Sequence, residues 1–336
     1  MSQPQDLEAL MVQMLAAAGR CASGARLDAE WVAKLSDRAA LISKNAAKSR
    51  LNVFLFHQTV PKEASVISTP DIKGLDHGAM DYESLLRLNI SIALWSNPNC
   101  RILLFTDKTF LANYPEHPRV YIIRLDLAAA EPMFERVVTM AAYVASQAFT
   151  APTIFLDSDA FLIRPLATLF NNEFDVAVTY RDNPGMMPIN EGVIFANDLN
   201  LDATRRFFER YLATYLQLEK SPDVVAAYGN IRRWRGGQLS INGISGARMR
   251  YARSSSETLD GATKLAYLPC SQHNLSDISE SEIVRGISAR SSVIHLKGNR
   301  KSWINSLINA LKFDGFTDSQ QSEQISAKSI SIKSLC

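Results

Sequence analysis

The chain has 336 residues, of which 47% are hydrophobic and 21% are charged, and its formal net charge is +2. This length allows a sizeable core in one large domain or two modest ones, and the composition is that of an ordinary globular protein. The nearly balanced charge gives no support to nucleic-acid binding. Lys and Arg are also spread along the chain, with the exception of the run RRWR at 232–235.

The cysteines and the N-terminus favour a cytoplasmic protein. The four cysteines form neither a CxxC pair nor a metal-ligand spacing, which is typical of reduced thiols. The N-terminus lacks the leading basic residues of a signal peptide. No stretch reaches the roughly 18–20 apolar residues that a membrane span needs. Peripheral association with a membrane surface is still compatible with the sequence.

The first residues are expected to be helical. Apolar residues three and four apart predict helices over 6–20 and 28–47. We assign 1–48 to a helical N-terminal extension without a catalytic role. Its helices are candidates for homo-oligomer contacts or for docking of an acceptor.

The next part of the chain alternates between strands and helices. Short continuous apolar runs that end in polar groups predict buried strands of a parallel sheet. The predicted strands are 51–58, 101–107, 119–126 and 153–157, and the predicted helices are 82–95 and 131–149. This alternation predicts an α/β domain with a mostly parallel sheet, in which ligands bind at the carboxyl ends of the strands.

Beyond residue 165 the order changes. We expect strands at 174–182 and 190–198, a helix at 202–220, and short strands such as KLAYLP and SSVIHL within 229–300. We assign residues 49–312 to the α/β domain. The Ser-rich residues 313–336 predict a disordered tail.

Two carboxylates, Asp157 and Asp159, interrupt an otherwise apolar segment, TIFLDSDAFLIRP. Buried unpaired carboxylates are costly and two of them repel each other, so a positive charge is expected beside them. Oxygen ligands at i and i+2, on a loop that leaves a strand, suit Mg²⁺ or Mn²⁺. The structural alternative is an acidic pair that caps a helix or meets Arg164.

A strand followed by DxD also resembles the haloacid-dehalogenase-like phosphatases, in which the first Asp is the nucleophile and the second an acid/base. Gly-Thr usually follows the motif there, whereas Ala160 and Phe161 follow it here. The sequence also lacks the later Lys and acidic set that would complete that metal site. A Mg-dependent phosphatase is therefore the less favoured alternative.

Four segments, in order, resemble motifs of the GT-A-fold (Rossmann-like) nucleotide-sugar glycosyltransferases, and of the family-8 type retaining enzymes in particular. TIFLDSDAFLIRPL resembles their DXD segment, and NEGVIFAN resembles their N-S/T-G-V strand. RGGQLSIN resembles their DQ…N segment, and VIHLKGNRKSW resembles their H-x-x-G-x-x-K-P-W element. Together the four cover roughly residues 51–305.

The chain departs from these motifs at three positions. Glu191 stands where a small residue is commoner, Gly237 replaces the Asp of DQ, and Ser302 replaces the proline. These departures keep a second hypothesis open, which is a non-catalytic sugar-nucleotide or carbohydrate binder with the same fold.

The resemblance implies a metal site and a diphosphate site. Asp157, Asp159 and His295 would bind Mn²⁺ or Mg²⁺. Lys301 would meet the β-phosphate, Gly298 would let the backbone approach it, and Trp303 would pack beside this loop. From the residues alone, the alternative for His295 is a hydrogen-bonded core histidine, and the alternative for Lys301 is a surface lysine.

The nucleotide of the donor, with UDP favoured, is expected across the strand ends. Candidates for its contacts are His57, Gln58, Asp107 and Ser158. Arg136 resembles a basic residue that faces the diphosphate or the sugar, and its alternative is a solvated helix face.

Asn190, Glu191 and Gln238 are the candidates for catalysis on the side of the sugar and of the acceptor. The acceptor is expected to be a glycan or another hydroxyl compound. Retention is favoured by the HxxGxxK element, whereas Glu191 as a general base would suit inversion. The run RRWR fits either a grip on an anionic acceptor or an ordinary surface.

Overall fold

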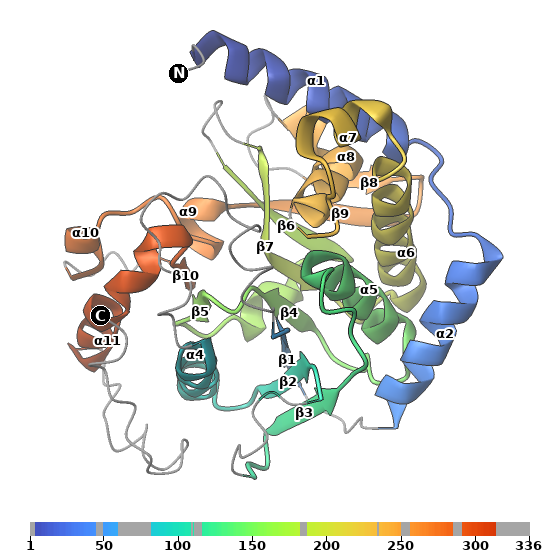
Figure 1. Cartoon of the computed structure of the whole chain (residues 1–336). Coiled ribbons are helices and arrows are strands. Elements are labelled where there is room, and N and C mark those ends of the chain that lie inside the picture. Colours follow the sequence, from blue (N-terminus) through green and yellow to red (C-terminus); the bar gives the residue numbers. More distant parts are fainter. Residues whose placement is uncertain are drawn as a thin grey trace. The chain divides into compact units, whose positions relative to one another are not determined.

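The computed structural model describes residues 4–44, 50–59, 82–108, 110, 116–181, 187–233, 235–249, 256–284 and 291–313 (Figure 1). Within these ranges, no helix is both long and apolar enough to cross a bilayer. The predicted tail at 313–336 lies outside the described residues, except for the last residue of a helix.

The strands confirm the predicted α/β class. They form an eight-stranded sheet of order β3-β2-β1-β4-β7-β6-β9-β8 and a two-stranded sheet of β10 and β5. Their bounds are β1 Asn52–His57, β2 Arg101–Thr106, β3 Val120–Arg124, β4 Thr153–Leu156, β5 Ala160–Leu162, β6 Val176–Tyr180, β7 Ile189–Ala196, β8 Ser256–Leu259, β9 Thr263–Pro269 and β10 Val293–His295. Strands β1 and β2, β2 and β3, and β6 and β9 pair in parallel, whereas β7 and β8 pair antiparallel to β6 and β9.

The helices of the described residues follow several of the predicted segments closely. They are α1 Pro4–Ala22, α2 Ala29–Ser43, α4 Tyr82–Ser96, α5 Pro132–Ala145, α6 Leu201–Leu218, α7 Pro222–Tyr228, α8 Gly236–Met249, α9 Cys270–His273, α10 Glu280–Val284 and α11 Ile304–Phe313. Two 3₁₀ segments, η1 Ala167–Asn171 and η3 Gly298–Trp303, complete the set. Helix α8 and strand β5 are elements that the sequence patterns did not predict.

The chain divides into two compact units. The first unit contains Met1–Lys48, Ala128–Thr153 and Glu173–Pro269, and the second contains Ser49–Leu127, Ile154–Asn172 and Cys270–Cys336. The domain boundaries predicted near residues 48 and 312 stay predictions.

In the first unit the N-terminal helices pack on later helices of the same unit. Helix α1 lies beside α8 (Figure 1), and a Cβ built on Gly243 of α8 would lie 2.5 Å from the carbonyl oxygen of Ala18. Asp28 caps α2 by accepting a hydrogen bond from the Trp31 amide at 3.0 Å. The Arg38 guanidinium joins α2 to α5 through Glu135 at 2.8 Å.

In the second unit a continuous apolar cluster supports the short sheet of β5 and β10. Its buried members are Leu85, Leu88, Ile92, Phe161, Ile163, Ile278, Ile283, Ile294, Leu296, Ile304, Leu307, Ile308, Ala310 and Leu311. They come from α4, α10, α11 and the segments around the two strands. The cluster therefore anchors both strands, so that the polar groups at their ends are held on a rigid base.

Candidate metal centre

The loop that carries both carboxylates is fixed by hydrogen bonds. Buried strand β4 ends at Leu156, and the amide of Ala160 closes the turn by donating to the carbonyl of Asp157 at 3.0 Å. The side-chain amide of Asn89, on α4, donates to the carbonyls of Ser158 at 3.0 Å and of Ala160 at 2.9 Å. These bonds satisfy buried carbonyls and hold the Asp-Ser-Asp turn in one shape.

His295 reaches this loop through strand pairing. Strand β10 runs antiparallel to β5, with His295 opposite Ala160. The amide of Leu296 donates to the carbonyl of Asp159 at 2.9 Å, and the His295 amide donates to Leu275 at 2.9 Å. Two segments far apart in the sequence are thereby locked together at the acidic turn.

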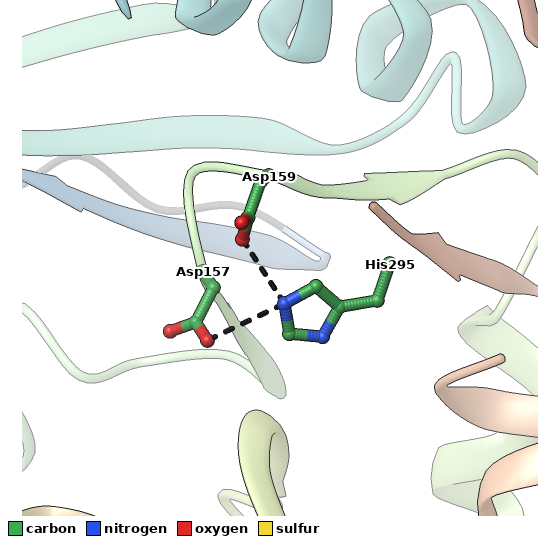
Figure 2. Close-up of side chains that lie close together, drawn as sticks. All are labelled: Asp157, Asp159 and His295. Carbon is green, nitrogen blue, oxygen red and sulfur yellow. Dashed lines mark hydrogen bonds and ion pairs between the residues drawn. The ribbon is translucent and has the colours of Figure 1, made fainter. Parts of the chain in front are cut away.

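The three side chains point toward one another (Figure 2). His295 Nε2 lies 3.0 Å from Oδ1 of Asp159 and 3.6 Å from Oδ2 of Asp157. One ligand atom from each residue lies within 4.8 Å of the other two. The His295 and Asp159 side chains are 2% and 13% exposed, whereas that of Asp157 is 32% exposed, so the cluster is accessible from the side of Asp157.

Asn274 sets the orientation of the imidazole. Its Oδ1 lies 2.9 Å from Nδ1 of His295. Because a carboxamide oxygen only accepts, Nδ1 carries a proton in this contact and is not the nitrogen that would bind a metal. The ring is then presented to the carboxylates through Nε2, which is the usual arrangement of a metal-binding histidine with an outer hydrogen-bond partner.

The Lys301 side chain brings a positive charge into contact with this cluster. Its Nζ lies 2.7 Å from Oδ2 of Asp159, and its side chain is 11% exposed, which excludes the alternative of a surface lysine. Lys301 belongs to η3, which begins at Gly298 with a φ of +57°. This left-handed conformation is readily adopted by glycine. Trp303 ends η3 and packs against the apolar cluster.

Burial and charge oppose each other at this cluster. Burial raises the pKa of Asp159, but the Lys301 ammonium and the His295 ring together hold the pKa of this carboxyl well below its usual range. Burial lowers the pKa of Lys301, but Asp159 and then Tyr82 raise it, and the net direction is upward. Burial also lowers the pKa of His295, by more than Asp159 raises it, so the ring favours the neutral form that binds metals.

The donor set fits a small divalent cation. Ligand atoms about 2.1 Å from an octahedral ion lie about 3 Å apart when they are neighbours in its coordination shell. The spacing of 3.0 Å between His295 Nε2 and Asp159 Oδ1 matches this value. Two carboxylates and one imidazole suit Mg²⁺ or Mn²⁺, with positions left for oxygens of a ligand.

The predicted nucleotide contacts lie on the second unit's strand ends. His57 ends β1, and its ring lies 3.9 Å from the ring of Phe110 between centroids. Asp107 follows β2 and accepts from the amides of Thr59 at 2.7 Å and of Phe110 at 3.0 Å. Gln58 is buried. Asp107 therefore organises the two loops around His57.

The remaining predicted residues form a buried cluster of the first unit. Glu191 Oε1 pairs with Nη1 of Arg136 at 2.5 Å and accepts from the Tyr211 hydroxyl at 2.7 Å. Burial and then Glu191 raise the pKa of Tyr211, which keeps its hydroxyl protonated as the donor. The Arg136 side chain is 6% exposed, so the predicted alternative of a solvated helix face is wrong.

Helix α8 is tied to strand β7 next to this ion pair. Gln238 Oε1 accepts from the Glu191 amide at 3.2 Å, and its Nε2 donates to the Ile189 carbonyl. Asn242 Oδ1 accepts from the Ile189 amide at 2.9 Å. Asn190 is buried, and its Oδ1 accepts from the Gly192 amide at 3.2 Å.

Of the run RRWR, Arg232 is engaged by acidic side chains. It pairs with Glu219 at 2.6 Å and with Glu131 at 2.8 Å, which raises the pKa of the guanidinium further. This favours a structural role for Arg232 over a grip on an anionic acceptor. Trp234 lies outside the described residues.

Three residues that support these clusters were missed from the sequence: Asn89, Asn274 and Tyr211. Asn89 left a signal, because it lies among apolar residues in LLRLNISIALW and a buried polar group needs partners. Asn274 and Tyr211 left none, since their contacts depend on how distant segments pack.

No family model matches the chain, and no curated protein matches it. Several solved structures to which it is similar are glycosyltransferases. The galactosyltransferase LgtC, in complex with donor and acceptor sugar analogs, has a TM-score of 0.47 and 11% identity, over 85% of this chain and 100% of that chain. The glycosyltransferase GlyE of Streptococcus pneumoniae TIGR4 has a TM-score of 0.45 and 12% identity, over 84% of this chain and 66% of that chain.

A glycosyltransferase involved in the glycosylation of the major capsid of PBCV-1 has a TM-score of 0.42 and 12% identity, over 77% of this chain and 98% of that chain. TM-scores below 0.5 at these identities do not assign a function. The function of the chain therefore has to be argued from its own side chains.

Proposed function

We propose that the chain is a metal-dependent glycosyltransferase that moves a sugar from a nucleotide-diphosphate sugar to a glycan or another hydroxyl acceptor. UDP-sugar is the favoured donor. The observation that carries the proposal is the convergence of Asp157, Asp159 and His295, with ligand atoms within 4.8 Å of one another. The motif order found in the sequence independently supports the same chemistry.

Transfer of a sugar from a diphosphate leaves negative charge on the departing nucleoside diphosphate. A bound Mn²⁺ or Mg²⁺ supplies compensating positive charge, which is worth most where water is excluded. Asp157, Asp159 and His295 would hold this ion. Lys301, already held at 2.7 Å from Asp159, would bind the β-phosphate with its ammonium, and Gly298 would allow the backbone to approach it.

The nucleotide would bind along the strand ends of the second unit. His57, Gln58, Asp107 and Ser158 are assigned to this part of the donor. The neutral, half-buried ring of His57 suits stacking or hydrogen bonding to a base, because partial burial lowers its pKa to about 4. Asp107 would act through the loops that its two oxygens hold.

Asn190, Glu191 and Gln238 are assigned to the sugar and acceptor side on the resemblance of their motifs, and Arg136 to the diphosphate or the sugar of the donor. Retention of configuration is the favoured outcome, on the HxxGxxK element. The cytoplasmic location and the oligomer contacts through α1 and α2 stay predictions from the sequence.

The experiment that tests the proposal is a calorimetric titration of UDP and of GDP, each with and without Mn²⁺. It uses the wild type and two variants, Asp157→Asn and Asp159→Asn. The Asp126→Asn variant is the matched control, because this carboxylate of the same unit is 91% exposed and forms a surface ion pair with Lys108. Thermal unfolding of each variant shows that it is folded.

Metal-dependent binding of one diphosphate, lost in both site variants and kept in Asp126→Asn, supports the donor site and identifies the nucleotide. Binding of neither diphosphate overturns it. Release of inorganic phosphate from a phosphate ester that is lost in Asp157→Asn would replace it with the phosphatase hypothesis. Binding of donor with neither transfer nor hydrolysis would replace it with the non-catalytic binder.

A further inference from the structure

The carboxylate of Glu191 fills the space that a side chain at position 237 would occupy. A Cβ built on Gly237 would lie 2.1 Å from Oε1, 2.6 Å from Cδ and 2.7 Å from Oε2 of Glu191. Separations this short lie far inside van der Waals contact. Positions 191 and 237 therefore share one volume, and only one of them can fill it.

Neither residue can easily move aside. The Glu191 carboxylate is held by the Arg136 guanidinium at 2.5 Å and by the Tyr211 hydroxyl at 2.7 Å. On the other side, Gln238 next to Gly237 accepts from the Glu191 amide at 3.2 Å, which fixes the register of α8 against β7. Any side chain at 237 would have to break one of these contacts.

These are two of the positions at which the chain departs from the motifs that it resembles. It has a carboxylate on β7 where a small residue is commoner, and a glycine on α8 where an Asp is commoner. Each departure removes the conflict that the other would create. We propose that the two are an exchange, in which Glu191 supplies from β7 the buried carboxylate that position 237 would otherwise supply from α8.

The exchanged carboxylate acts as a positioning residue for Arg136. Both terminal nitrogens of the guanidinium contact Glu191: Nη1 contacts Oε1 at 2.5 Å and Nη2 contacts the backbone carbonyl at 3.4 Å. The Arg136 and Glu191 side chains are 6% and 5% exposed, so water does not replace these contacts. Two hydrogen bonds to one residue fix the plane of the guanidinium as well as its position.

A carboxylate engaged in this way is a poor general base. The Oε1 atom of Glu191 already accepts hydrogen bonds from two donors. If the carboxylate moved away to accept a proton elsewhere, the buried guanidinium of Arg136 would lose its charge partner. The positioning role therefore takes the place of the general-base role considered from the sequence. This inference rests on the proposed function for the use to which Arg136 is put, but the exchange itself does not.

The test is a cycle of four proteins: wild type, Glu191→Ser, Gly237→Asp and the double variant. We expect each single variant to lower the midpoint of thermal unfolding by about 5 °C or more, the first by removing the partner of Arg136 and the second by crowding two carboxylates. The double variant should unfold at a higher temperature than either single variant. Equal or additive losses in the double variant would overturn the exchange.

The positioning role is measured on turnover with a panel of UDP- and GDP-sugars and Mn²⁺. Glu191→Ser should lower kcat about 10²-fold while the affinity for the free nucleoside diphosphate with Mn²⁺ stays unchanged. The double variant should recover most of kcat. Recovery of stability without recovery of kcat would overturn the positioning role.

Glu135→Gln is the matched control. Glu135 is also a carboxylate of the first unit in an ion pair with an arginine, and its side chain is 10% exposed. We expect this variant to lower the unfolding midpoint without lowering kcat of the folded fraction. If the wild type binds neither UDP nor GDP, the proposed function fails, and the unfolding cycle still decides whether the exchange is correct.

Discussion

The ammonium of Lys301 lies 2.7 Å from Oδ2 of Asp159, and the two side chains are only 11% and 13% exposed. The same carboxylate lies 3.0 Å from the His295 ring through its other oxygen. Lys301 is therefore the positive charge that makes a second carboxylate beside Asp157 tolerable when no ion is bound. A divalent cation would take over this task.

Replacement of Lys301 by Met should destabilise the metal-free protein. The variant leaves Asp159 buried without its ammonium, which typically costs about 3 kcal/mol of the free energy of unfolding. Mn²⁺ should recover part of this loss, because the ion restores positive charge at the same carboxylate. The measurement is thermal unfolding of both proteins in Mn²⁺ and in a chelator.

Lys108→Met is the control for this comparison. Its ammonium forms an exposed ion pair with Asp126, and pairs of this kind contribute little to stability. We expect no measurable shift in either buffer. A Lys301→Met protein as stable as the wild type in the chelator would contradict the role of the pair.

Replacement of Asn274 by Ala should weaken metal binding without removing a ligand. Asn274 Oδ1 is 2.9 Å from Nδ1 of His295 and holds the ring with Nε2 toward the carboxylates. Loss of such an outer partner typically lowers metal affinity about 10–100-fold. The measurement is calorimetric titration with Mn²⁺.

The exposed Asn172 offers the control, since its side chain donates to the Leu169 carbonyl of the preceding 3₁₀ segment, away from the metal centre. Asn172→Ala should bind Mn²⁺ as the wild type does. An unchanged affinity in Asn274→Ala would mean that the ring is oriented by other contacts.

Acid should destabilise the protein partly through His57. Burial lowers the pKa of His57 from 6.5 to about 4, and Asp107 offsets this only in part. Between these two values the unfolded chain binds a proton that the folded chain does not, so stability falls as pH falls from 6.5 to about 4. The contribution approaches about 3 kcal/mol at the acid end of this window.

The measurement is the free energy of unfolding of the wild type and of His57→Gln across this pH window. The wild type should lose more stability, because the pKa values of His117, His273 and His295 are also lowered but are shared by both proteins. Parallel pH profiles would show that His57 is protonated as readily in the folded protein as in the unfolded one.

The elements with a clear apolar pattern could be predicted from the sequence, and those without one could not. The apolar run at 51–58 and the amphipathic segment at 202–220 became β1 and α6, because burial of one face or of a whole strand leaves a periodic signal. Strand β5 has three residues, too few for a period. Helix α8 was missed because its glycines and polar residues, in GGQLSINGISGARM, weaken a helical pattern.

The candidate site also has a part that could be predicted from the sequence and a part that could not. Asp157 and Asp159 could be placed at the end of a buried strand, and His295 and Lys301 within a motif. The pairing of β5 with β10, which brings them together, depends on distant segments of the chain. Glu191 and Gly237 were each visible as departures, but their shared volume depends on the packing of α8 on β7.

The close packing of α1 on α8 gives a prediction for the first unit. A Cβ on Gly243 would lie 2.5 Å from the Ala18 carbonyl oxygen and 3.0 Å from the Ala18 Cβ. Because a helix backbone cannot yield locally, Gly243→Ala should push the two helices apart, at a cost of about 1–3 kcal/mol that outweighs the gain in helix propensity. The measurement is the free energy of unfolding in urea.

Gly19→Ala is the matched control on the facing helix. A Cβ on Gly19 would meet the Gly243 carbonyl oxygen at 3.9 Å, which is ordinary contact. Alanine is favoured over glycine inside a helix by about 1 kcal/mol, so this variant should be as stable as the wild type or more stable. If Gly243→Ala were stabilising as well, α1 would not be held against α8 at this point. Both variants replace glycine by alanine inside a helix, so both gain the same helix propensity. Opposite changes in the free energy of unfolding would therefore come from the contact between α1 and α8.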